Sequence, residues 1–126
     1  MKKYEFTGET KTVSFLFKDV TLHRIQAITS FASVVAGELG GWIEKEENLS
    51  HKGDAWVYSN AKVYGNAVVR ENAEVRGNAE VRGNAEVYGN AVVRGKAVVR
   101  GKAEVREKAV VRGKAVELAK LQILTD

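Results

Sequence analysis

Apolar residues recur at every sixth position through the second half of this chain. An alanine takes each sixth position, and a valine follows two residues after almost every alanine. Residues two apart in a strand point to the same side, so each unit turns its alanine and valine inward. The alanines are Ala55, Ala61, Ala67, Ala73, Ala79, Ala85, Ala91, Ala97, Ala103, Ala109 and Ala115, and the valines run in the same step from Val57 to Val111. A strict period of six predicts a solenoid of very short strands.

Glycine followed by asparagine or lysine separates most of these units, as in Gly65-Asn66 and Gly95-Lys96. Glycine adopts a left-handed backbone at little cost and asparagine is the next most tolerant residue, so both members of each pair are expected to suit a tight corner. The chain has no proline, so the backbone N–H groups of the repeat are free to join a ladder between coils.

The pattern resembles the hexapeptide repeat of left-handed parallel β-helices, in which an aliphatic and a small residue each recur at six. The aliphatic position matches Val57 to Val111 and the small position matches Ala61 to Ala115, over about half the chain. The resemblance implies an all-β fold in which three hexads make one triangular coil, giving about three to four coils here.

The flanks of the repeat predict caps. Residues 1–36 are expected to form an N-terminal β cap, with a turn at Thr7–Thr10 between its first two strands. Residues 37–54 predict an irregular first coil, because Ile43 and Leu49 already occupy the alanine phase. The coil is expected to stop at Glu117, which takes the place of the next core valine. The expected parts are therefore 1–36, 37–54, the repeat at 55–116, and a C-terminal cap or oligomerisation tail at 117–126; the patterns of 28–36 and 116–124 leave helix and strand open.

The leader carries a second resemblance. The run LHRIQAI, followed by GELGGWIEKEENLSHKGDAWVYSNAKVYGNA, covers roughly residues 20–67. It resembles the N-terminal part of small hexapeptide-repeat proteins of bacteriophages and prophages. These proteins are often named transferase-like only because they contain the repeat. This resemblance implies a phage-derived protein of a family without a settled activity.

Composition narrows the class of protein. The chain has no cysteine, which excludes disulfides and thiolate metal sites, and no other pattern of metal ligands is present. It has no apolar run of about 18 residues and no secretion signal at its start, so a cytoplasmic protein of a bacterial or phage-infected cell is expected, without membrane contact. Residues 94–114 hold eight cations and two carboxylates, a balance of +6 that predicts an anionic partner or a solvated basic surface.

Outward positions of successive coils stack every 18 residues. The columns that follow the core valines are Tyr58-Arg76-Arg94-Arg112, Tyr64-Arg82-Arg100 and Arg70-Tyr88-Arg106. Arginines can hold phosphates while tyrosines stack on bases, so these columns predict a nucleotide-like anionic ligand in basic clefts between subunits. Both residue types are also ordinary strand-surface residues, which remains the alternative. Duplex DNA is disfavoured, because no element is shaped to enter a groove.

Valine replaces glutamate before the core valine in the last coils, where it is expected to face outward. These positions are Val92, Val98, Val110 and Val116. Exposed valine columns predict a subunit interface, and the family resemblance implies a homotrimer.

The resemblance also implies an alternative activity, acyl transfer from coenzyme A with a histidine base. Only His23 and His51 are present, and neither lies in the regular coils. His51 in the corner Ser50-His51-Lys52 is the candidate base, but an exposed turn residue is the simpler interpretation. The sequence therefore favours a non-enzymatic, oligomeric protein without a cofactor that binds a protein or an anionic small molecule, with a coenzyme A-dependent acyltransferase as the alternative.

Overall fold

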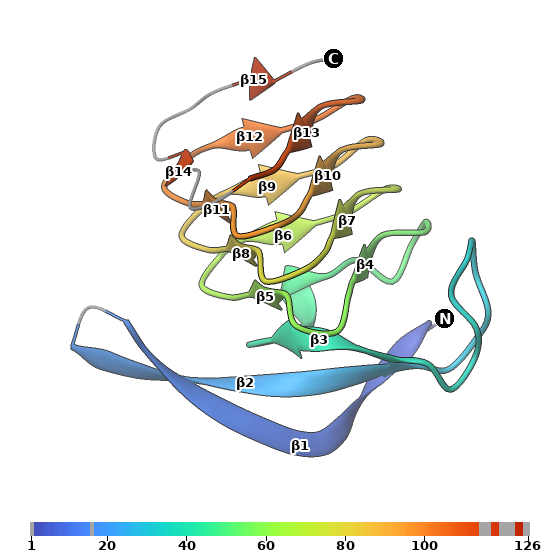
Figure 1. The fold of residues 1–126 in the computed structure, drawn as a ribbon. Coiled ribbons are helices and arrows are strands. Elements are labelled where there is room, and N and C mark those ends of the chain that lie inside the picture. The colour runs from blue at the N-terminus through green and yellow to red at the C-terminus, as the bar shows by residue number, and fades with distance from the viewer. Residues whose placement is uncertain (1, 16, 114–116, 119–122, 125–126) are drawn as a thin grey trace.

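The computed structural model describes residues 2–15, 17–113, 117–118 and 123–124. A parallel β-helix stands on an antiparallel hairpin at its N-terminal end (Figure 1). Among the described residues the only helical element is the 3-10 helix η1 (Glu46–Asn48), and no helix has the length and apolar character needed to cross a membrane. The all-β solenoid expected from the sequence is confirmed.

Within the described residues, twelve two-residue strands form the coils, and every third strand stacks in parallel. The first stack is β4-β7-β10-β13, the second continues β5-β8-β11-β14, and the third is β6-β9-β12-β15. Val57 pairs with Val75, so one coil takes 18 residues, and Figure 1 shows it winding in the left-handed sense. The strands are β4 (Trp56–Val57), β5 (Lys62–Val63), β6 (Val68–Val69), β7 (Glu74–Val75), β8 (Glu80–Val81), β9 (Glu86–Val87), β10 (Val92–Val93), β11 (Val98–Val99), β12 (Glu104–Val105), β13 (Val110–Val111), β14 (Glu117–Leu118) and β15 (Ile123–Leu124).

The sequence predicts that the coil stops at Glu117, and this prediction is wrong: two further strands join the coil. Leu118 pairs with Val99, so the offset is 19 residues here instead of 18. This shift of one place puts Leu118, and not Glu117, in register with the core valines. Residues 117–118 and 123–124 are both strands in the ladder. Within 116–124, the remaining positions lie outside the described residues, and so does Val116.

The repeat buries the residues that its period predicts. Every described alanine and valine of the two core columns is at most 4% exposed, from Ala55 to Val111. The ladder bonds run between coils, as from the Lys62 N–H to the Ala79 carbonyl at 3.0 Å. The core is therefore a narrow column of small side chains closed on three sides by strands.

The corners differ from expectation in one respect. The first residue of each pair is left-handed, as with Gly95 at φ 72°, but no asparagine or lysine that follows is. The second residue instead donates its N–H to the next coil, as Asn66 does to the Gly83 carbonyl at 2.8 Å. Asparagine's tolerance of a positive φ is thus not what the corner uses, and lysine fits equally well.

The N-terminal cap is a single hairpin, and the turn expected at Thr7–Thr10 does not separate two strands. β1 (Tyr4–Phe15) runs through the predicted turn at Thr7–Thr10 as a bulge, with Gly8 at φ 97°, and pairs with β2 (Lys18–Ala27). β2 pairs with β3 (Leu39–Ile43), and β3 joins β5 in parallel. The hairpin therefore extends one face of the coil. Residues 28–36 are neither helix nor strand but a loop of tight turns.

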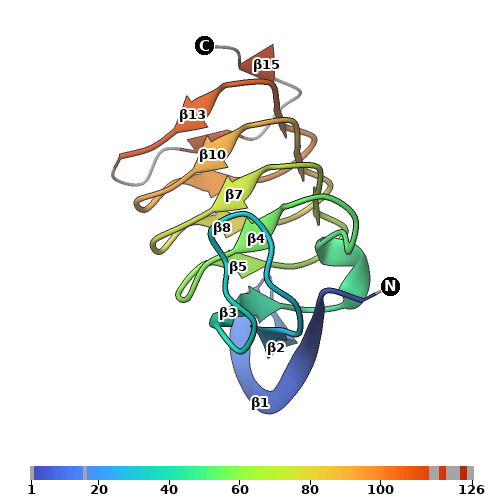
Figure 2. The ribbon, with the colours of Figure 1, turned by 90° about the vertical axis from the view of Figure 1, so that its right-hand side faces the viewer.

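This loop crosses the base of the first stack, in blue-green in Figure 2. Phe31 and Tyr4 contact Trp56 edge-on, with ring centroids 5.3 and 6.3 Å away. Trp56 occupies an outward position of the repeat, yet it is fully buried because the cap covers it. Gly41 lies so close below the coil that a Cβ would sit 2.5 Å from the Tyr58 carbonyl oxygen, so β3 packs backbone to backbone.

Candidate functional site

The lower coils bring arginine and tyrosine together as the 18-residue columns predict. The Arg76 guanidinium lies 3.9 Å from the centroid of the Tyr58 ring, one coil below it. Arg70 lies 4.1 Å from the ring of Tyr88, one coil above. Each pair is a cation–π contact along a column, so these cations already have an aromatic partner in the free protein.

Glutamates neutralise the same lower coils. Arg76 pairs with Glu74, and this bond raises the pKa of its guanidinium. Arg70 pairs with Glu86 at 3.2 Å, and Arg82 Nε lies 3.9 Å from Glu80. Such partly exposed pairs contribute little stability, but they remove free positive charge from this part of the surface.

Tyr64 does not lie on the surface as its repeat position suggested. It is 5% exposed and packs with Val20, Leu22 and Trp42, because β2 folds over it. Burial raises the pKa of its phenol, and its hydroxyl donates to Glu80 at 2.9 Å. Its ring is not available for stacking on a base.

The charge of the coil changes sharply at residue 94. The coil at 58–75 has two cations and two carboxylates, and the coil at 76–93 also has two of each, so both are neutral. The coil at 94–111 has six cations against Glu104 and Glu107, a net of +4. Its cations include a lysine at each of its three corners: Lys96, Lys102 and Lys108. The basic coil, defined here as residues 94–111, is the strongest charged feature of the described chain.

The other predicted ligand and interface positions lie in the basic coil or directly next to it. Arg94 and Arg112 are exposed, whereas Arg100 and Arg106 are half-buried. Among the valines, Val92 and Val98 are half-buried and Val110 is 47% exposed. Apolar side chains thus lie beside cations at this end of the coil.

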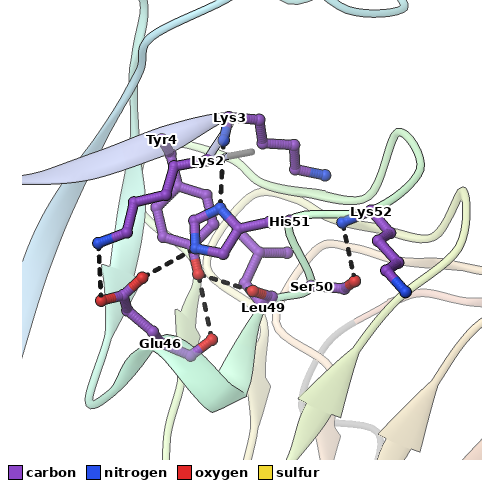
Figure 3. Close-up of polar contacts among 8 residues, drawn as sticks. All are labelled: Lys2, Lys3, Tyr4, Glu46, Leu49, Ser50, His51 and Lys52. Carbon is purple, nitrogen blue, oxygen red and sulfur yellow. Dashed lines mark hydrogen bonds and ion pairs between the residues drawn. The ribbon is translucent and has the colours of Figure 1, made fainter.

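His51 lies in a cluster at the opposite end of the coil (Figure 3). Its Nδ1 accepts the Lys3 N–H at 3.2 Å, so the ring carries its proton on Nε2, which donates to Glu46 at 2.9 Å. Its ring stacks on Tyr4, with centroids 4.1 Å apart. The hydrogen bond from His51 and the charge of Lys2 lower the pKa of Glu46. Both ring nitrogens are in use, so His51 is not placed as a free base.

The same cluster fastens the N-terminus to the coil. The Tyr4 hydroxyl donates to the Leu49 carbonyl at 2.6 Å, and burial raises the pKa of this phenol. The Lys3 ammonium donates to the Ala55 carbonyl at 2.6 Å and to the Gly53 carbonyl at 3.1 Å. Burial lowers the pKa of Lys3 to about 8. Sequence reasoning missed these roles, since nothing in the run at 2–4 signals a contact almost fifty residues away.

The second histidine has a packing role as well. His23 stacks on Phe6, with ring centroids 4.5 Å apart and planes at 5°. Within the residues that the structure describes, no group of three or more histidine and acidic side chains could hold a metal ion.

Comparison with known proteins gives one informative match. No family model matches the chain. A protein of Escherichia coli (strain K12) named "Uncharacterized acetyltransferase YdcK" is 39% identical over 62 residues. The match covers 46% of this chain, and the chain spans only 19% of that relative. Together with the coil, the similarity fits the hexapeptide-repeat β-helix class.

Proposed function

We propose that the coil is the donor-binding part of a hexapeptide-repeat acyltransferase, and that the basic coil holds the phosphates of coenzyme A. The observation that carries the proposal is the step from two neutral coils to a coil of net charge +4. Solubility alone does not explain the step, because cations spread over all the coils would keep the protein soluble equally well. The name of the similar protein from Escherichia coli supports acyl transfer as the activity.

The residues of the basic coil suit such a donor. Coenzyme A carries a diphosphate and a further phosphate, which arginine and lysine bind through charge-assisted hydrogen bonds. Arg94 and Lys96 are exposed, and Val110 offers an apolar surface in the same stack as Val92. These residues would bind and orient the donor on the outside of the coil.

Transfer also requires a base to take the proton of the acceptor amine or hydroxyl. His51 would have to release Glu46 or the Lys3 N–H to serve, because both of its nitrogens are hydrogen-bonded. This observation favours a second candidate function, in which the protein binds an anionic nucleotide-like molecule, or a protein partner, without catalysis.

Calorimetric titration with coenzyme A tests the donor site. The informative variant is the triple Lys96→Asn, Lys102→Asn, Lys108→Asn, because asparagine occupies the same corners in the coil below. It should weaken coenzyme A binding roughly tenfold or more, given the strength of hydrogen bonds to charged groups. A matched control replaces three exposed lysines outside the regular coils, Lys2, Lys18 and Lys52, and should bind as the parent does. If both triple variants bind coenzyme A equally more weakly than the parent, the effect comes from net charge alone, and the proposed site on the basic coil is refuted.

Turnover then separates the two candidates. Acetyl-coenzyme A is incubated with mixed amine and hydroxyl acceptors, and thiol release is followed in the parent and in His51→Ala. Binding with turnover that His51→Ala abolishes supports the acyltransferase. Binding of coenzyme A and ATP alike, without turnover, supports the second candidate, and no binding of either contradicts both.

A further inference from the structure

Exposed apolar side chains gather on the N-terminal cap. Among the described residues, the large apolar side chains that are exposed are Phe17, Ile28, Val35, Leu39 and Val110. Phe17 lies at the hairpin turn, Ile28 and Val35 lie in the loop that follows the hairpin, and Leu39 begins β3. Monomeric proteins seldom leave large apolar side chains uncovered together, so the exposed side chains at each end of the cap point to contacts with another molecule.

Phe17 is the most unusual of them. It lies at the hairpin turn, its exposure is 110%, and its φ is 63°. A left-handed backbone is unfavourable for a bulky residue, and such positions occur where a function requires the conformation. A glycine or asparagine would make this turn more easily, so packing within one chain does not explain a phenylalanine here.

The two apolar parts of the cap lie at opposite ends of one ribbon (Figure 1). Phe15 pairs with Lys18 at the turn, and Tyr4 pairs with Ala27 at the far end, where the loop with Ile28 and Val35 begins. A ten-residue strand separates them by about 30 Å. The ribbon is joined to the coil through β3 and β5, so the two ends cannot fold back on each other.

We infer that Phe17 of one copy packs against the loop of the next copy, onto Ile28, Val35 and Leu39. A second copy is the occupant because each chain carries both halves of the contact. The charges also match, since exposed Lys18 follows Phe17 and Glu38 lies between Val35 and Leu39. A contact between two different patches is heterologous, and it closes into a ring when the rotation allows. The assembly is therefore made at the cap, away from the valine columns.

Cysteine cross-linking tests the contact directly, because the chain has no cysteine of its own. A disulfide forms only when the Cβ atoms come within about 4.5 Å. Phe17→Cys mixed with Val35→Cys should give a cross-linked dimer on mild oxidation, whereas each variant alone should stay uncross-linked. The double variant should give a finite ladder whose largest member is the ring. Val110→Cys mixed with Phe17→Cys is the matched control, at 47% exposure on the coil, and should not cross-link.

Sedimentation tests the same contact without cysteines. Phe17→Ser should raise the dissociation constant of the assembly by about tenfold to a hundredfold, from the burial of one phenylalanine. Its circular dichroism should match the parent, because an exposed side chain leaves the fold intact. Val110→Ser should assemble normally. A monomeric parent, a Phe17→Ser variant that assembles as the parent does, or a Val110→Ser variant that dissociates would each overturn the inference.

Discussion

Replacing Asn48 by leucine should be among the most damaging conservative changes in the first coil. Asn48 is fully buried, and its carboxamide is saturated. Its oxygen accepts the N–H groups of Glu44 and Lys45 at 3.1 and 2.9 Å. Its nitrogen donates to the carbonyls of Gly65 and Ala67 at 3.2 and 2.8 Å.

The regular coils explain why those two carbonyls need this side chain. One coil higher, the equivalent carbonyls of Gly83 and Ala85 accept from the backbone N–H groups of Asn66 and Val68. In the first coil η1 interrupts the backbone, and the Asn48 amide replaces both donors. Leucine has a similar volume but no polar atoms, so four backbone groups lose a partner at a buried position. A loss of about 3–5 kcal/mol follows, from roughly 1 kcal/mol per hydrogen bond plus part of the cost of unsatisfied groups.

The measurement is thermal unfolding followed by circular dichroism, at two protein concentrations so that assembly is separated from folding. At roughly 4 °C per kcal/mol, the melting temperature should fall by about 12–20 °C. Asn48→Asp keeps an oxygen that accepts both N–H groups but turns the second carboxylate oxygen toward two carbonyls, so it should also be destabilised. Asn66→Leu, at an exposed corner of a regular coil, should change stability by less than about 0.5 kcal/mol. An Asn48→Leu protein that melts within a few degrees of the parent would refute this account.

Four further changes should have distinct outcomes. Val81→Asp buries an unpaired carboxylate in the core column and should prevent folding; a soluble, β-rich variant would contradict the packing. Glu107→Gly should stabilise the protein by about 0.5–1 kcal/mol in urea unfolding, because it relieves a φ of 60°. Glu71→Gly should stabilise it less, since the Glu71 carboxylate accepts the Gly89 N–H. Burial lowers the pKa of Lys3 from 10.5 to about 8. Between pH 8 and 10.5 the unfolded chain therefore binds more protons than the folded protein, and the free energy of unfolding rises with pH. The melting temperature should therefore rise across this range and flatten in Lys3→Met, until the raised pKa of Tyr4 reverses the trend above pH 10.

The repeat could be predicted because one short rule decides each of its positions. Inward alternation fixes Ala and Val, and every described corner from Gly65 to Gly113 has one left-handed residue. The exposure of outward positions does not follow from the same rule. Trp56 and Tyr64 stand where the period faces solvent, yet both are buried because the cap and β2 fold over them. The period gives the direction of a side chain, and the rest of the chain decides whether water reaches it.

The hairpin and the His51 cluster depend on pairings that local patterns do not contain. A glycine between threonines suits a turn and a bulge equally, and β1 continues through it as a bulge because β2 pairs with β1 on both sides. Lys3 meets His51 across 48 residues of sequence, and Tyr4 meets Leu49 across 45. Neither contact has a periodic signal, so the predicted exposure of His51 as a simple turn residue misses its hydrogen bonds.

At the corners of the regular coils, the fold does not determine whether the residue is asparagine or lysine. Asn84 and Lys96 make the same ladder bond, each donating its N–H to a glycine carbonyl at 2.8 Å. Both have exposed side chains, so packing does not choose between them. The exchange of asparagine for lysine nevertheless occurs at all three corners of one coil and at none of the coil below it. Because backbone and core are the same in both coils, folding alone does not require the exchange. The change from a neutral to a basic coil is therefore the part of the repeat to test first for binding.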